Sequence, residues 1–98
     1  MTTAPATPTR ERPRTGGGDG LGDAWRVIVL NDSHNTFHGV AFALASVIPG
    51  ISFDEGMSLA NRIHNTGQAI VWSGHREAAE LYWTRLGDLG LTMAPLER

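Results

Sequence analysis

The sequence contains no cysteine and no lysine, and both absences narrow the range of possible functions. Without cysteine the chain can form no disulfide framework. We therefore expect it in the cytoplasm, or in the chloroplast stroma if it is a plastid protein. Arginine supplies all 8 of the Lys and Arg charges, and the formal net charge is −2. Nucleic-acid binding needs a dense basic surface, so no nucleic-acid partner is expected.

Long apolar runs are missing as well. No run approaches the roughly 18 residues of a membrane-spanning helix. The beginning of the chain, MTTAPATPTR, lacks the apolar segment of a secretory signal. We therefore expect no membrane association, and the length of 98 residues predicts one folded domain.

The composition changes near residue 24. Residues 1–24 are rich in Thr, Ala and Gly, include the glycine-dense stretch RTGGGDGLGD, and contain no aromatic residue. Such a segment cannot bury enough apolar surface to offset the entropy lost on ordering. We predict a disordered N-terminal arm and linker at 1–24 and a folded domain at 25–98.

Hydrophobic periodicity predicts the first elements of this domain. Residues 25–30, WRVIVL, are apolar and β-branched, which predicts a strand. From Phe37 onward apolar residues recur on one helical face, so a helix is expected there. Asn35 or Thr36 supplies its N-cap, and the Pro-Gly pair at 49–50 ends it.

Four more elements complete the prediction. A capping box, SFDE at 52–55, starts a second helix that ends before Gly67. Residues 68–72 predict a strand, and a third helix follows before Gly90. Its expected inward face is Ala78, Ala79, Tyr82, Leu86 and Leu89. Residues 91–96 predict a short edge strand containing Pro95, which gives the order β-α-α-β-α-β.

One histidine lies in a special position on the second helix. Ala60, Ile63 and His64 are spaced i, i+3, i+4, so their side chains lie side by side. A histidine among small and apolar residues at a helix end is either a functional group or a boundary residue hydrogen-bonded to the backbone. The spacing alone leaves both interpretations open.

Several ordered motifs resemble the ClpS family. They are the strand ending in LND, the NTF helix start, and RIHNTGQAIVW some thirty residues on; the GLTMAPLE ending and the HNTF variant resemble its cyanobacterial and chloroplast branch. The resemblance implies an adaptor that delivers N-degron proteins to a Clp AAA+ protease. It also implies a small α/β (α+β) fold, a three-stranded antiparallel sheet packed on helices, similar to the C-terminal domain of the ribosomal stalk protein.

The resemblance assigns roles to particular residues. Asn31 and Asp32 match the pair that holds the free α-amino group of the substrate, and His64 matches the histidine that completes this site. The residues implied for the hydrophobic pocket and its rim are Ser33, Asn35, Phe37, Val40, Ala60, Ile63 and Thr92. Residues 33, 37, 60 and 92 depart from the residue types usual in the family, so the choice among Phe, Tyr, Trp and Leu as first substrate residue stays open.

The partner surface is also implied by the resemblance. Glu77 matches a glutamate that contacts the regulatory ATPase, while Tyr82 stands where a basic residue is common. The partners implied are a ClpC- or ClpA-type AAA+ ATPase and N-degron substrate proteins, and the arm at 1–24 would be engaged by the unfoldase during delivery. Alternatively, Glu77 simply complements the dipole of its helix. We expect a monomer without a cofactor.

Other function classes compete with this interpretation. Asp32 and His64 could act as acid and base in an enzyme, but the chain has no cysteine and no serine in a nucleophile elbow, so we expect no catalysis. A metal site could use His34 and His38, joined by His64 or His75. A third alternative is a ribosome-stalk-like interaction domain without N-degron recognition.

Overall fold

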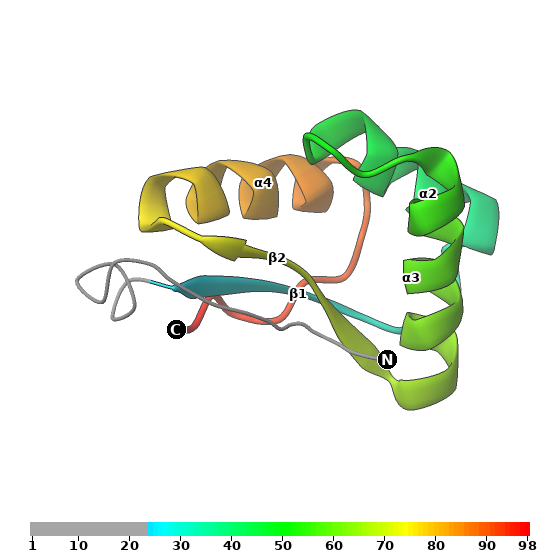
Figure 1. Ribbon diagram of the computed structural model, residues 1–98. Coiled ribbons are helices and arrows are strands. Elements are labelled where there is room, and N and C mark those ends of the chain that lie inside the picture. Colours follow the sequence, from blue (N-terminus) through cyan, green and yellow to red (C-terminus); the bar gives the residue numbers. More distant parts are fainter. Residues whose placement is uncertain (1–23) are drawn as a thin grey trace.

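The structure, a computed structural model, describes residues 24–98. The arm predicted at 1–24 lies outside the described residues apart from Ala24. The elements in chain order are β1 (Trp25–Leu30), α2 (Phe37–Val47), α3 (Phe53–Thr66), β2 (Gln68–Gly74) and α4 (Arg76–Asp88). Figure 1 shows α4 lying above the two strands, while α2 and α3 stand together at the other side of the molecule.

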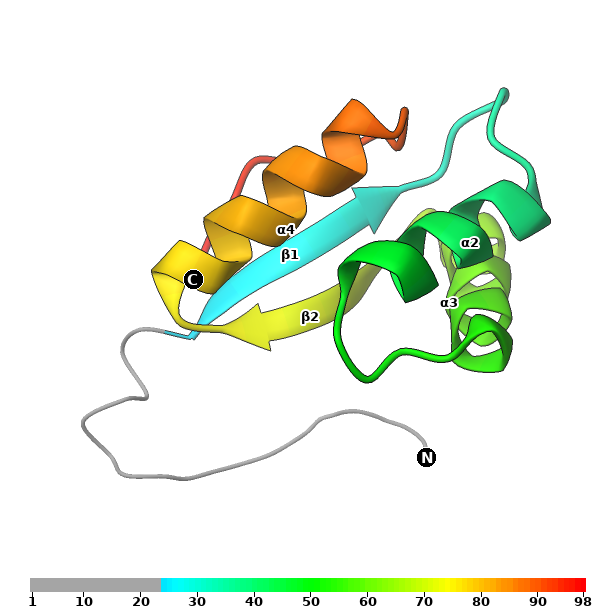
Figure 2. The ribbon, with the colours of Figure 1, turned by 90° about the horizontal axis from the view of Figure 1, so that it is seen from above.

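The two strands pair antiparallel along their whole length. Trp25 lies opposite Gly74 at one end and Leu30 lies opposite Gln68 at the other, with a register shift between Val27 and Ile28. The second strand is therefore two residues longer than the predicted 68–72. Figure 2 shows that α4 runs alongside β1, and that the C-terminal end of β1 leads into the loop before α2.

The predicted third strand at 91–96 is wrong, and with it the three-stranded sheet. In the described chain this segment runs beside β1 but forms only two isolated bridges, Val29 with Met93 and Arg26 with Glu97. Pro95 falls between the two bridges, and proline has no N–H to donate to a ladder. The observed order is β-α-α-β-α, followed by an extended segment held by separate hydrogen bonds.

Local side chains explain where the helices begin and end. Of the two candidates for the first N-cap, Thr36 is the one used, because its Oγ1 accepts from the N–H of Gly39 at 2.9 Å. The predicted capping box of α3 is confirmed: Ser52 and Glu55 each accept from the other's backbone N–H. The inward placement of Leu89 is wrong, since this residue lies beyond the last helical turn and is 54% exposed.

The core lies between the helices and one face of the sheet. Its fully buried large side chains are Leu44, Ile48, Leu86, Val27 and Val29. The helices α2 and α3 approach especially closely, because a Cβ built on Gly56 would lie 2.7 Å from the carbonyl oxygen of Ala41. Only glycine fits at this contact without a shift of the backbone.

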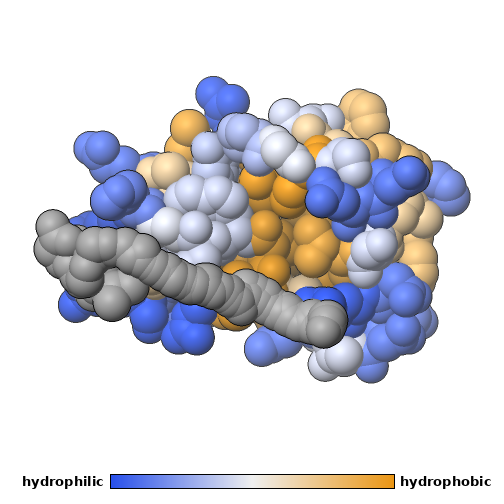
Figure 3. All heavy atoms as spheres, viewed as in Figure 1, coloured by the Kyte–Doolittle hydropathy of each residue, from blue (hydrophilic) through white to orange (hydrophobic). Residues whose placement is uncertain are grey.

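Some apolar side chains remain at the surface. Figure 3 shows an apolar area in the middle of one face, flanked by polar groups on both sides. The exposed large hydrophobic residues of the described chain are Phe42, Phe53, Ile70, Leu81 and Leu89. None of the helices described is both long enough and apolar enough to span a membrane.

The helix contact at Gly56 gives a stability prediction. We expect Gly56→Ala to lower the free energy of unfolding by about 1–3 kcal/mol, because the new methyl group must push against the backbone of Ala41. Gly87→Ala is the matched control: its Cβ would meet only the Cγ of Met93, at 3.8 Å. That variant should gain up to about 1 kcal/mol of helix propensity. Urea denaturation of both variants measures the difference, and equal effects would contradict the close approach.

Candidate functional site

The loop between β1 and α2 is fixed at both sides by backbone hydrogen bonds. The N–H of Asn31 donates to the carbonyl of Gly67 at the end of α3, at 2.9 Å. The N–H of Leu30 donates to the carbonyl of Thr92 in the segment after α4, at 2.8 Å. The polar residues that follow β1 are therefore held between two parts of the chain that lie far from them in sequence.

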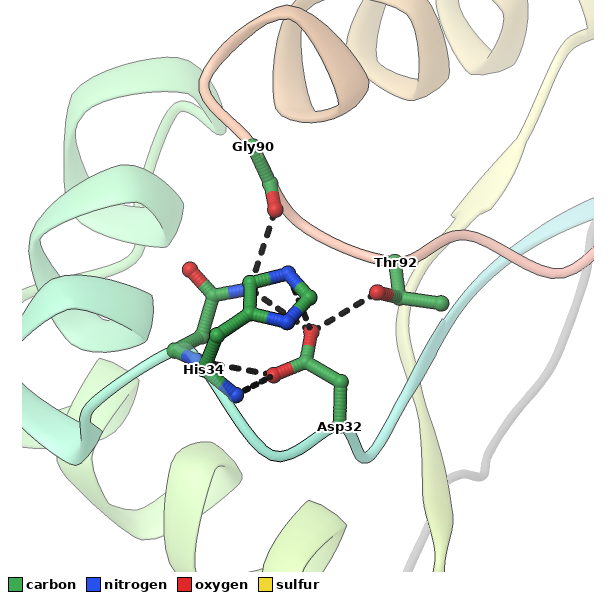
Figure 4. A network of polar contacts seen from close by, with 5 residues as sticks. Asp32, His34, Gly90 and Thr92 are labelled. Carbon is green, nitrogen blue, oxygen red and sulfur yellow. Dashed lines mark hydrogen bonds and ion pairs between the residues drawn. The ribbon is translucent and has the colours of Figure 1, made fainter.

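The carboxylate of Asp32 organises this loop. Its Oδ1 accepts from the backbone N–H groups of His34 and Asn35, at 3.1 and 2.8 Å. Its Oδ2 accepts from Nδ2 of Asn35 and from Oγ1 of Thr92, both at 2.7 Å. Asn35 also donates to the carbonyl of Gly90, at 2.9 Å. Figure 4 shows the carboxylate turned toward the segment that carries Gly90 and Thr92.

This environment changes the acidity of Asp32. Burial by itself would raise the pKa of the carboxyl group, because it penalises the charged form. The hydrogen bonds from Thr92 and Asn35, followed by the one from the backbone of His34, favour the charged form and outweigh burial. The pKa of Asp32 is consequently held well below its usual range, so the carboxylate stays ionised at every physiological pH.

A hollow of about 290 Å³ opens beside this network. We call it the pocket. Its buried apolar lining comes from β1, α2, α3 and the segment after α4: Val29, Val40, Ala60, Ile63 and Leu91. Exposed polar side chains, those of Asn31, Ser33 and His64, lie at its mouth. The ring centroid of Phe37 lies 5.1 Å from that of His64.

Every residue predicted for the amino-group site and for the pocket contributes to this one hollow. The amino-group residues are Asn31, Asp32 and His64, and the pocket and rim residues are Ser33, Asn35, Phe37, Val40, Ala60, Ile63 and Thr92. The spacing on α3 explains part of the convergence, since Ala60, Ile63 and His64 share one side of the helix. The geometry brings the set together, while the role of each residue stays a prediction.

The sequence motifs missed four lining residues. They are Val29, Leu30, Thr36 and Leu91. Leu30 ends β1 directly before the predicted Asn31, and Thr36 is the N-cap of α2, so their positions at the two ends of the loop were a usable signal. Leu91 follows Gly90 in the segment expected to be a strand, and nothing local in the sequence points it toward the pocket.

The residues predicted to contact the ATPase lie elsewhere. Neither Glu77 nor Tyr82 lines the pocket. Glu77 is exposed in the first turn of α4. The other end of this helix leads to Gly90 beside the pocket, so about 18 Å of helix separates Glu77 from that end. Tyr82 packs edge-on against Trp72, with ring centroids 5.0 Å apart.

The arrangement of histidines does not favour the alternative metal site. Nowhere in residues 24–98 do three His, Cys, Asp or Glu side chains group as metal ligands would. His34 lies in the loop, with its Nε2 3.8 Å from Oδ2 of Asp32, whereas the ring of His38 lies 5.9 Å from that of Phe53.

The sequence is similar to proteins of one family. The family model described as "ATP-dependent Clp protease adaptor protein ClpS" matches residues 22–94. The ClpS adapter protein of Nostoc sp. is 55% identical over 73 residues, covering 74% of this chain and 75% of the relative. That of Thermosynechococcus vestitus is 53% identical over 73 residues, covering 74% of this chain and 78% of the relative.

A solved structure has a similar fold. It is the structure of Agrobacterium tumefaciens ClpS2 bound to L-phenylalaninamide, with a TM-score of 0.70 and 27% sequence identity. The alignment covers 76% of this chain and 95% of that one. The likeness therefore includes almost the whole of the bacterial domain.

The hydrogen bonds of Asp32 give a prediction about stability and pH. Asp32→Asn should lower the free energy of unfolding at pH 7 by about 1–3 kcal/mol, because an amide cannot accept from all four donors. The lowered pKa adds stability that is complete above the ordinary Asp value of about 3.9. This stability is lost as pH falls from there toward the lowered pKa of the folded protein. Urea denaturation should therefore show the gap between wild type and variant narrowing below pH 4, and a gap independent of pH would contradict it.

Proposed function

This chain belongs to the ClpS family of ATP-dependent Clp protease adaptor proteins, in its cyanobacterial-type branch, and from this we propose its substrate. It binds the free α-amino group and the bulky hydrophobic first residue, Phe, Tyr, Trp or Leu, of N-degron proteins. It then delivers them to a Clp AAA+ unfoldase-protease, as an adaptor rather than as an enzyme.

The observation that carries this proposal is a set of polar acceptors at the mouth of an apolar pocket. A protein N-terminus is an ammonium group with three donors, and it needs acceptors that are anionic or strongly polar. Asn31 offers an amide oxygen, neutral His64 a ring nitrogen, and Asp32 a negative charge that its lowered pKa keeps in place. All three line the same hollow.

The apolar half of the pocket fits one large side chain. The whole pocket has a volume of about 290 Å³, just below the range of about 300 to 1,000 Å³ that is typical of ligand pockets. Buried Val40 and Ile63 supply apolar contact surface from two helices. The ligand of Agrobacterium tumefaciens ClpS2, L-phenylalaninamide, combines a free α-amino group with a benzyl side chain, and this chemistry supports the proposal.

The expected affinity follows from both halves. Hydrogen bonds to a charged group contribute roughly 1.5–3 kcal/mol each. Burial of a large apolar side chain adds roughly 1.5–3 kcal/mol. Association itself costs several kcal/mol. The dissociation constant should therefore be in the micromolar range, which corresponds to a binding free energy of about −8 kcal/mol. Neither half suffices alone, so internal residues and acetylated ends are rejected.

The proposed partner is a ClpC- or ClpA-type ATPase, bound by a monomer of this protein. Glu77 and Tyr82 on α4 lie away from the pocket, so an ATPase could contact them while a substrate is bound. The apolar area of Figure 3 supports a protein-binding face, because exposed apolar patches often mark such sites.

Peptides that differ only at their first residue test the proposal. A peptide beginning with free Phe should bind with micromolar affinity, and acetylation should weaken binding by about a hundredfold or more. A peptide beginning with free Gly should lose the apolar contribution and bind at least about tenfold more weakly. Fluorescence anisotropy of labelled peptides measures all three, and equal binding of free and acetylated peptides would exclude this function.

Peptide binding should also depend on pH through His64. Protonation removes the ring acceptor and adds repulsion against the ammonium, so affinity should fall between pH 8 and pH 5.5, where histidine side chains ionise. Asp32 stays ionised over this range and contributes no such dependence. His64→Gln keeps an acceptor that does not ionise, so its affinity should be nearly independent of pH.

Two matched variants control this experiment. His75→Gln changes a histidine at the N-cap of α4, outside the pocket, and should keep the pH dependence of the wild type. His34→Gln removes the histidine whose Nε2 lies 3.8 Å from Oδ2 of Asp32, and this variant should also keep the pH dependence. If His34→Gln lost the pH dependence and His64→Gln kept it, the effect would belong to His34 and the role proposed for His64 would be contradicted.

A further inference from the structure

We propose that Asp32 is a positioning residue, which acts on the substrate through Asn35 and Thr92 rather than by a hydrogen bond of its own to the ammonium group. The inference rests on the proposed function and deepens it. The direct acceptors are then Asn31, Ser33 and His64, and the carboxylate contributes negative charge from behind them.

The first step is the saturation of the carboxylate. An ionised carboxyl group has about four lone-pair sites. In this structure four donors occupy them, at 2.7 to 3.1 Å: two backbone N–H groups, the amide of Asn35 and the hydroxyl of Thr92. An ammonium group could bond directly to Asp32 only by displacing one of these donors.

The second step is the state of the other polar groups at the pocket mouth. Within residues 24–98 no hydrogen bond engages the side chains of Asn31, Ser33 or His64. All three are exposed and line the pocket. They supply an amide oxygen, a hydroxyl oxygen and a ring nitrogen, one acceptor for each donor of an ammonium group.

The third step is what the bonds of Asp32 hold in place. The segment after α4 is no strand and pairs with β1 only at isolated bridges. Separate hydrogen bonds hold its backbone, among them those from Leu30 to the carbonyl of Thr92 and from Leu91 to the carbonyl of Leu86. Thr92 and Gly90 are tied to the β1–α2 loop through Asp32 and Asn35 (Figure 4). Leu91 lies between these two attachments, is 6% exposed, and forms one apolar wall of the pocket. The bond between Asp32 and Thr92 is therefore a side-chain link between the carboxylate and the segment that carries this apolar wall.

Thr92 allows a direct test, because its hydroxyl can be removed without touching the carboxylate. Thr92→Val should weaken binding of a free Phe peptide about tenfold, since the segment that carries Leu91 loses its side-chain link to Asp32. Thr92→Ser keeps the hydroxyl and should bind within about twofold of wild type. Thr84→Val is the control, because Thr84 is exposed on α4 and outside the pocket. The ratio between free and acetylated peptide should stay that of wild type in all three.

A double variant adds a second criterion. If Asp32 acts through Thr92, the effects of Asp32→Asn and Thr92→Val on peptide affinity should be strongly non-additive. A direct ligand predicts the opposite: Thr92→Val would leave the charge in place and free one lone pair, so affinity would be unchanged or higher. That result would overturn the inference.

A measurement on the wild-type protein covers the case in which Thr92→Val fails to fold. The hydroxyl proton of Thr92, followed by NMR, should stay protected from exchange when a free Phe peptide binds. Its release on binding would show that the ammonium displaces Thr92, and the inference would fail. Failure of the proposed function looks different: wild type would then bind free and acetylated peptides equally, whatever Thr92 does.

Discussion

One carboxylate, that of Asp32, holds two distant parts of the chain together at the place where the pocket forms. It closes the loop after β1 on itself and ties that loop to the extended segment after α4. The charge of this group is stabilised by hydrogen bonds rather than by a cation, since no arginine contacts it in the described chain. A fixed negative charge with no arginine beside it is a suitable environment for a positively charged ligand.

The division between polar mouth and apolar interior follows from which elements contribute. Loop residues supply most of the polar groups, because the backbone there has no ladder to complete and the side chains remain accessible. His64 adds a ring nitrogen from the last turn of α3. Helices α2 and α3 supply apolar side chains at helical spacing, so Val40 and Ile63 face the hollow from two sides. A substrate must satisfy both regions at once, and this makes the end of a protein chain different from any internal segment.

Much of the site could be predicted from the sequence, because its residues lie next to recognisable element ends. Asn31 and Asp32 directly follow a strand, and His64 lies near the C-terminus of a helix that Gly67 ends. The failures concern contacts between distant residues. Thr92 is 60 residues from Asp32, and no local sequence pattern predicts the hydrogen bond between them. The prediction of a strand at 91–96 also fails, because Pro95 has no N–H to donate and the segment forms only isolated bridges with β1.

The contact between Gly56 and the backbone of Ala41 also limits how this protein can change. The helices that carry Phe37, Val40, Ala60 and Ile63 already touch through their main chains, so their separation is fixed. Adaptation to a different first residue must therefore proceed by exchanging side chains inside a frame of constant width. Ala60 is the smallest apolar side chain in the lining, so its exchange for a larger one would narrow the hollow while the scaffold stays the same.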